Sequence, residues 1–193
     1  MSVRRLSQSF LSTRGRGKGS TFVAGYGFGV DEMDLLQRVT VGAGGTASIV
    51  FSSIPQTYQH LQIRVAALGA AAVHGDLQMN GDTGNNYAAH GLYGTGSTVV
   101  ADAGASRANI YSVVRLLSDT APAVSFIEVL DYTSTSKNKV VRTVRGCETN
   151  SSGEVSLMSG VRISTAAVTS IQITGRSGNF AQHSVFSLYG VVG

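Results

Sequence analysis

The sequence is poor in the residues that would mark it as a disulfide-stabilised, disordered or membrane-spanning chain. It has 1 cysteine, 2 prolines, no tryptophan and only 13% charged residues among its 193. Because Cys147 has no partner in the chain, an intramolecular disulfide is excluded. Low charge combined with 42% hydrophobic residues excludes a disordered chain. The longest small-apolar run, residues 66–73, is far shorter than the roughly 20 residues of a membrane helix.

The beginning of the chain is basic, whereas the rest is nearly neutral. No apolar segment follows the first two arginines, so we expect no signal peptide and a soluble protein made without export. The first 20 residues contain no acidic residue and five basic ones: Arg4, Arg5, Arg14, Arg16 and Lys18. The net charge of +4 therefore comes from an arm of +5, since the remainder carries ten basic and eleven acidic side chains. We expect residues 1–30 to form an extended Gly/Ser-rich arm and residues 31–193 to form one domain.

Short alternating apolar runs, separated by Gly, Asn, Asp and Ser, predict an all-β domain. Residues 39–51 read as a hairpin around the glycine-rich turn 42–45. Further strands are expected at 61–65, 77–79, 110–117, 124–130, 140–147, 155–158, 161–163, 168–173 and 185–191. This spacing favours an antiparallel two-sheet sandwich, with a jelly roll as the expected layout. A turn of helix near residues 106–115 remains an alternative.

Motifs for catalysis, metal binding and phosphate binding are missing from the sequence. It has no Gly-x-Ser-x-Gly, no His-Glu-x-x-His, no zinc-type cysteine pair and no phosphate-binding loop. The histidines are scattered, although folding could bring His74, Asp76 and His90 together. A carboxylate pair such as Asp76 with Asp82 is the only other support for an enzyme. We therefore expect no enzymatic activity, no cofactor and no metal, and we interpret Cys147 as a small core residue.

The most distinctive segment is the polar loop within residues 77–96. Its Asn-Gly turn, Asx turns and glycines explain it as a structural loop that satisfies its own hydrogen bonds. The alternative is a site for a glycan or a hard cation such as Ca²⁺, with carboxylate and amide oxygens as ligands and a tyrosine stacked on a sugar. The candidate residues for that site are Asp82, Asn85, Asn86, Tyr87 and Tyr93.

The basic arm suggests two kinds of partner. Arginine and lysine interleaved with glycine and serine can neutralise phosphates. They can equally lie across the acidic surface of a neighbouring subunit. We favour the protein partner over nucleic acid, because the rest of the chain is not basic. The arm also carries aromatic residues that could pack against such a partner: Phe22, Tyr26 and Phe28.

Three stretches of the chain together resemble a group of tailed-bacteriophage virion proteins. The first, around residues 51–64, contains Ile-Pro-Gln-Thr-Tyr-Gln-His-Leu-Gln-Ile and is similar to the IPxTYxxLxI strand of that group. The second, residues 80–87, reads Asn-Gly-Asp-Thr-Gly-Asn-Asn-Tyr and is similar to its NGDxGxNY loop. The third is the closing Ser-Leu-Tyr-Gly of residues 187–190. The resemblance covers about residues 45–193 and leaves out the arm.

This resemblance implies a virion component with a β-sandwich body, of the head-fibre, decoration or tail-fibre type. We therefore expect a structural protein, assembled in the host cytoplasm and anchored through its arm to capsid or tail subunits. An unpaired cysteine agrees with assembly in a reducing compartment. We expect a homo-oligomer, with a trimer favoured, and no membrane partner. The alternative is a carbohydrate-binding module of a tail fibre that recognises a glycan on the host surface.

Overall fold

The computed structural model describes residues 32–69 and 73–193, which belong to one unit, Glu32–Gly193. Every regular element in this part of the chain is a β-strand, and the strands form two antiparallel sheets. The all-β, two-sheet prediction is therefore confirmed. Among the residues described, there is no helix with the length and apolar character to cross a membrane.

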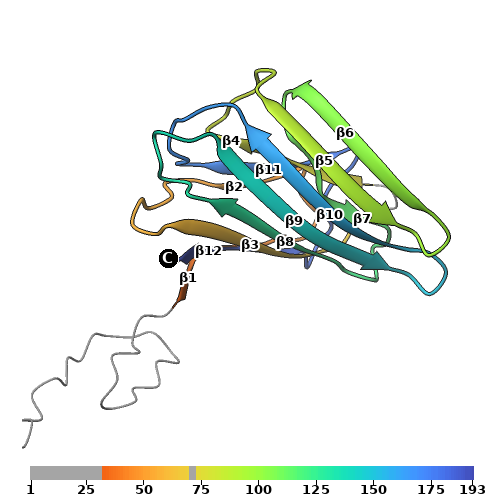
Figure 1. The fold of residues 1–193 in the computed structure, drawn as a ribbon. Helices are drawn as coiled ribbons and strands as arrows, with labels where there is room; N and C mark the ends of the chain where they lie inside the picture. Colours follow the sequence, from red (N-terminus) through yellow and green to blue (C-terminus); the bar gives the residue numbers. More distant parts are fainter. Residues whose placement is uncertain (1–31, 70–72) are drawn as a thin grey trace, which may run out of the picture. The chain divides into compact units, whose positions relative to one another are not determined.

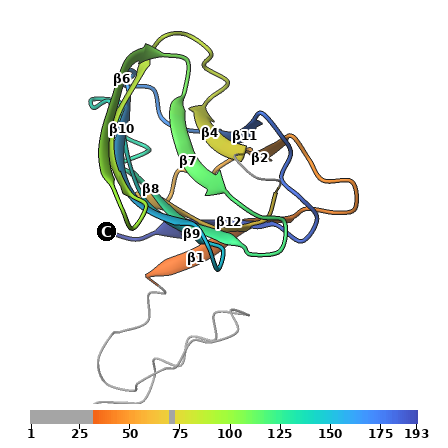
Figure 2. The same cartoon turned by 90° about the vertical axis from the view of Figure 1, so that its right-hand side faces the viewer.

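The two sheets differ in width. The large sheet has eight strands in the order β1 (Met33–Thr40), β12 (Val185–Val191), β3 (His60–Ala67), β8 (Ala123–Leu130), β9 (Lys139–Glu148), β10 (Gly153–Arg162), β5 (Tyr87–Gly94) and β6 (Val99–Arg107). The small sheet has four, in the order β2 (Ser48–Phe51), β11 (Ile171–Arg176), β4 (Val73–Met79) and β7 (Ile110–Leu116). Figure 1 shows the long strands of the large sheet side by side. In Figure 2 that sheet curls around the small one.

Period-2 alternation explains why these segments form strands with one buried face. In β9, Val141 and Thr143 are buried while Val140 and Val144 are exposed. Because side chains of a strand point alternately to opposite faces, the buried set meets the inner face of the small sheet. That core includes fully buried aromatic side chains such as Phe51. The unequal division into eight and four strands differs from a jelly roll, which has eight strands in all.

The predicted hairpin of residues 39–51 is wrong. β1 pairs with β12 in the large sheet, whereas β2 pairs with β11 in the small sheet. The intervening turn carries the chain from one sheet to the other, and Gly44 and Gly45 adopt φ of 88° and 72° there. A glycine-rich turn can either close a hairpin or carry the chain to another sheet. The pairing of β1 with β12 and of β2 with β11 therefore decides which of the two forms.

The segment after the polar loop forms two strands that the sequence pattern does not predict. β5 and β6 form an antiparallel pair at the edge of the large sheet, and neither was predicted as a strand. Their alanines and glycines give little of the β-branched or aromatic signal that marks a strand. Residues 106–115, considered for a helical turn, instead end β6 and build most of β7. The separate strands expected at 155–158 and 161–163 form one strand, β10.

Candidate functional site

The predicted attachment arm lies outside the described residues. This concerns Arg4, Arg5, Arg14, Arg16, Lys18, Phe22, Tyr26 and Phe28.

The polar loop after β4 is held by its own hydrogen bonds. Asp82 accepts hydrogen bonds from the backbone N–H of Gly84 at 3.0 Å and from the Asn86 amide at 3.1 Å. Its other oxygen accepts from Arg162 Nε at 2.9 Å. This last bond is the main cause that holds the pKa of Asp82 below its ordinary value. The one carboxylate of the loop is thus neutralised by an arginine, which leaves no free negative charge for a cation.

The remaining loop candidates separate in the structure. Tyr87 is fully buried and its hydroxyl lies 3.0 Å from the backbone nitrogen of Met79, so its ring is a core side chain and cannot stack on a sugar. Asn85 is exposed at the loop. Tyr93 lies six residues along β5 from Tyr87, roughly 20 Å away at strand spacing. Within the described residues, no three His, Cys, Asp or Glu side chains gather as a metal site would require.

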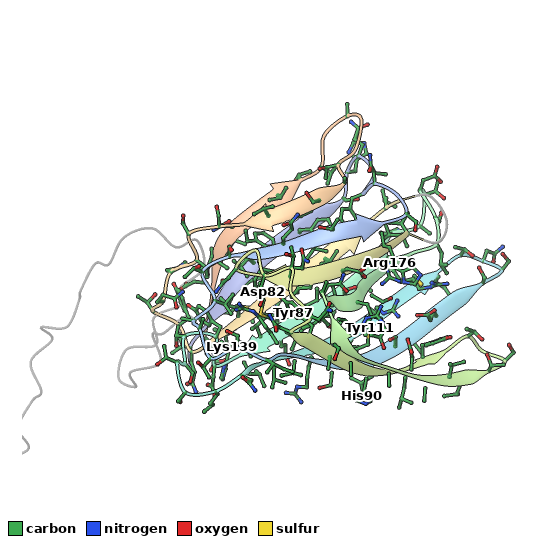
Figure 3. The ribbon with its side chains drawn as sticks, turned by 90° about the horizontal axis from the view of Figure 1, so that it is seen from above. Asp82, Tyr87, His90, Tyr111, Lys139 and Arg176 are labelled. Carbon is green, nitrogen blue, oxygen red and sulfur yellow. The ribbon has the colours of Figure 1, made fainter. Side chains whose placement is uncertain are left out.

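Of the histidine and carboxylate candidates, the structure brings together His74 and Asp76 and leaves His90 and Asp82 apart from them. His74 and Asp76, both on β4, contact the same residue of β7: His74 Nδ1 lies 2.6 Å from the Ser112 hydroxyl, and the Ser112 N–H donates to Asp76 at 2.8 Å. His90 is exposed on the outer face of the large sheet and projects away from this group in Figure 3. Asp76 and Asp82 each pair with a different arginine, Arg176 and Arg162.

A polar pocket of about 180 Å³ is lined by residues of both sheets. His74, Ser112, Arg115 and Arg176 come from the small sheet. The large sheet contributes the side chains of Tyr93, Asp102, Arg145, Glu154, Ser156 and Met158, and Tyr111 of β7 completes the lining. Figure 3 shows Tyr111 and Arg176 on this side, apart from Asp82, Tyr87 and Lys139. We call this the inter-sheet pocket.

Arg176 and Asp76 form a well-aligned ion pair in the inter-sheet pocket. Arg176 donates from Nε to one carboxylate oxygen at 2.8 Å and from Nη2 to the other at 2.6 Å. Such two-point pairing is the strong geometry for guanidinium and carboxylate. It is also the main cause that raises the pKa of Arg176.

A second, less well-aligned group joins two arginines to one carboxylate. Glu154 lies 2.9 Å from Arg115 Nε and 2.8 Å from Arg145 Nη2. Neither contact has hydrogen-bond alignment, and Arg145 Nε and Nη1 have no partner at all within the described residues. Arg145 is nevertheless only 7% exposed. Burial is the leading cause that lowers its pKa.

His74 is held in its neutral form. Its Nε2 contacts Arg115 Nη1, and because a guanidinium can only donate, the ring accepts there and its Nδ1–H donates to Ser112. Burial, followed by the charges of Arg115 and Arg176, lowers the pKa of His74 to about 4. At neutral pH the ring therefore adds no charge to the inter-sheet pocket.

Two irregularities in the strands shape the pocket wall around Tyr111. The register between β4 and β7 shifts beside Ser112, whose φ is 57°. A β-bulge re-aims side chains, and a left-handed φ at a serine costs free energy that the surrounding contacts must offset. A second shift, at the end of β6, accompanies a φ of 52° at Ser106. Next to it, Arg107 lies over the Tyr111 ring at 4.4 Å.

Sequence reasoning missed the arginines and the glutamate of the inter-sheet pocket. The sequence did contain a sign of this buried charge. In β9, Arg145 falls at every second position together with the buried Val141, Thr143 and Cys147, so it lies on the buried face. A charged residue at such a position predicts a charge inside the sandwich. Cys147 itself is buried, as predicted, and burial raises the pKa of its thiol.

An exposed apolar band crosses the outer face of the large sheet. One row of register partners runs through Phe126, Val144, Leu157 and Leu92. The next row contains Val124, Val155 and Val99, with glycines between them. These seven side chains account for most of the twelve large exposed hydrophobic residues in the described chain, so the exposure is concentrated and not scattered.

Comparison of the chain with protein-family models, with curated proteins and with solved structures gave no match.

Proposed function

We propose that this chain is a non-enzymatic structural protein of a bacteriophage particle, a head decoration, fibre or tail component that assembles with copies of itself. The observation that carries the proposal is the outer apolar band. At about 4.8 Å between strands, five strands make it roughly 20 Å wide. Monomeric proteins rarely expose contiguous apolar patches beyond a few hundred Å² unless these bind a partner.

The residues beside the band suit contact between identical copies. Glu128 and Arg142 are register partners in the next row, and their side chains lie 3.6 Å apart. Both signs of charge are therefore present at the edge of the band, so that opposite charges of neighbouring copies can face each other there. The band supplies the apolar centre and these residues the polar rim. A trimer is the closed assembly we favour.

Two further features support the proposal that the chain belongs to a bacteriophage particle. One is the resemblance of the three sequence stretches within residues 51–190 to virion proteins, and the other is the β-sandwich body. Attachment to capsid or tail subunits would use the basic arm, residues 1–30, with its five positive charges. The decisive measurement is quantitative mass spectrometry of particles purified from the source culture. A fixed copy number per particle, in multiples of three, is expected. Absence of the chain from purified particles contradicts the proposal.

The assembly surface has a matched test. We expect Leu157→Asp, in the middle of the band, to dissociate the full-length protein into monomers, because a charge at the interface centre loses its hydration without a partner. The control is Val50→Asp, which changes an equally exposed valine on the small sheet and should leave the assembly intact. Mass photometry reads both. A monomeric parent protein, or an assembly that tolerates Leu157→Asp, argues against the band as the interface.

A further inference from the structure

The inter-sheet pocket concentrates polar atoms that the protein does not satisfy. The described residues contain seven buried side-chain nitrogen or oxygen atoms without a well-aligned hydrogen bond, and five of them belong to this pocket. Two of the five, Arg115 Nε and Glu154 Oε1, lie at ion-pair distance from an opposite charge, whereas the Tyr111 hydroxyl, Arg145 Nε and Arg145 Nη1 do not. Buried polar groups are nearly always paired in folded proteins, since an unpaired one costs about 1–3 kcal/mol. A cluster of this kind indicates groups arranged for something other than stability.

The charges of the pocket do not balance in its interior. Arg176 and Asp76 neutralise each other, while Arg115 and Arg145 share the single carboxylate of Glu154. The exposed Asp102 is the only carboxylate of the lining that is left to offset the second arginine, so the positive charge without a close partner lies at the buried Arg145. The neutral ring of His74 does not change this balance.

The lining residues indicate which anion would fit. The volume of about 180 Å³ is below the roughly 300–1,000 Å³ of sites for drug-sized ligands, so the ligand is small. Tyr93 and Met158 give the pocket an apolar wall suited to a carbon skeleton. Asp102 is exposed in the lining and disfavours a doubly charged anion such as phosphate. A single carboxylate meets less of this repulsion.

We propose that the inter-sheet pocket binds the carboxylate group of a small organic acid, with Arg145 and Arg115 as its charged partners and the Tyr111 hydroxyl as a further donor. Guanidinium groups are the side chains best matched to a carboxylate. The neutral state of His74 fixes Arg115 as a donor to the ring and leaves the Ser112 hydroxyl able to donate into the pocket. This proposal does not depend on the particle function proposed above.

The test is to titrate small-molecule probes into the full-length protein. Binding is measured by calorimetry and by the shift in the unfolding temperature of the protein. The probes are glucuronate, acetate, glucose and inorganic phosphate at equal ionic strength. Glucuronate should bind with a Kd on the order of 1 mM, as a ligand of its size allows, and acetate more weakly. Glucose, which lacks the charge, should not bind. Equal or tighter binding of phosphate overturns the carboxylate assignment, as does a blank titration with both acids.

Variants connect the binding to the named residues. We expect Arg145→Met to weaken glucuronate binding by at least about tenfold, the effect of removing one charged hydrogen-bond partner. The control is Arg142→Met on the outer face of the same strand, which should bind as the parent does. Binding that survives Arg145→Met overturns the proposal.

A second variant changes the affinity in the opposite direction. Glu154→Gln removes the carboxylate that competes for Arg115 and Arg145, so glucuronate should bind several-fold more tightly and raise the unfolding temperature more than in the parent. A purely structural role for Glu154 predicts destabilisation without tighter binding. That result, in a folded sample, contradicts the assignment.

Discussion

The inner faces of β9 and β10 carry charged residues at both ends, and the two ends are built differently. At one end Lys139 and Arg162 are register partners, and at the other Arg145 and Glu154 lie near each other. Lys139 is fully buried, yet its ammonium donates to the backbone carbonyls of Ser134 at 2.5 Å and of two further residues.

The difference separates a structural role from a binding role. The Lys139 end is more fully paired, since the ammonium has three acceptors and Arg162 Nε pairs with Asp82, and Arg162 Nη1 is the one buried donor there without a partner. The Arg145 end is open, since two guanidiniums share one carboxylate and several donors stay unpaired. Paired buried charges hold loops in place, whereas the unpaired donors of Arg145 are free to take part in the binding that we propose.

The largest expected effect is at the Lys139 end. Lys139→Met should lower the free energy of unfolding by about 3 kcal/mol, because it leaves three backbone carbonyls without their charged donor. Lys137→Met, which removes an exposed lysine two residues away, should cost less than about 1 kcal/mol. Urea denaturation measures both. Similar costs for the two variants would mean that the ammonium does not hold the loop.

The next effect concerns the dependence of stability on pH at the open end. The unfolded chain protonates His74 near pH 6.5, whereas the folded ring has a pKa of about 4. Below pH 6.5 the unfolded state therefore binds more protons, and stability falls as the pH drops towards 4, by about 2 kcal/mol after allowance for partial exposure.

The groups that face the His74 ring explain the direction of this shift. Arg115, Arg176 and Arg145 disfavour a charged ring, and Asp76 opposes them. Denaturation curves between pH 4 and 7 should show the slope in the parent and in His90→Gln, and a flatter curve in His74→Gln. An unchanged slope in His74→Gln would assign the dependence to other groups.

The smallest expected effect is at the open end itself. Arg145→Met should change the free energy of unfolding by no more than about 1 kcal/mol, because Glu154 keeps Arg115 and the removed guanidinium is buried with two of its nitrogens unpaired. The same urea experiment compares it with Lys139→Met. A loss as large as that of Lys139→Met would show that both ends are structural, and it would remove the contrast between them.

Local pattern was sufficient for much of the fold. The alternation in β3, β8, β9 and β12 is strong enough to be read from the chain, and the two-sheet class follows from it. β5 and β6 were missed, because alanine and glycine pack into an edge pair only where neighbouring strands provide the surface. The failed hairpin of residues 39–51 has the same cause, a pairing chosen by distant strands.

The candidate sites also differ in whether neighbouring residues or distant strands determine their contacts. Asp82 and its turn residues are adjacent in the chain, so their mutual hydrogen bonds could be anticipated from the Asn-Gly turn. The inter-sheet pocket is lined by residues of seven strands, and no local pattern places Arg115 beside Arg145.

By itself the sequence determined the strands with clear alternation, the all-β class and the separation of a basic arm from a neutral body. Each of these follows from composition or from a period of two residues. The tertiary structure decided the sheet order, the burial of Tyr87 and the meeting of Arg145 with Glu154 and Arg115. Those depend on which strands pair and how two sheets face each other, which is a balance of packing free energies over the whole domain.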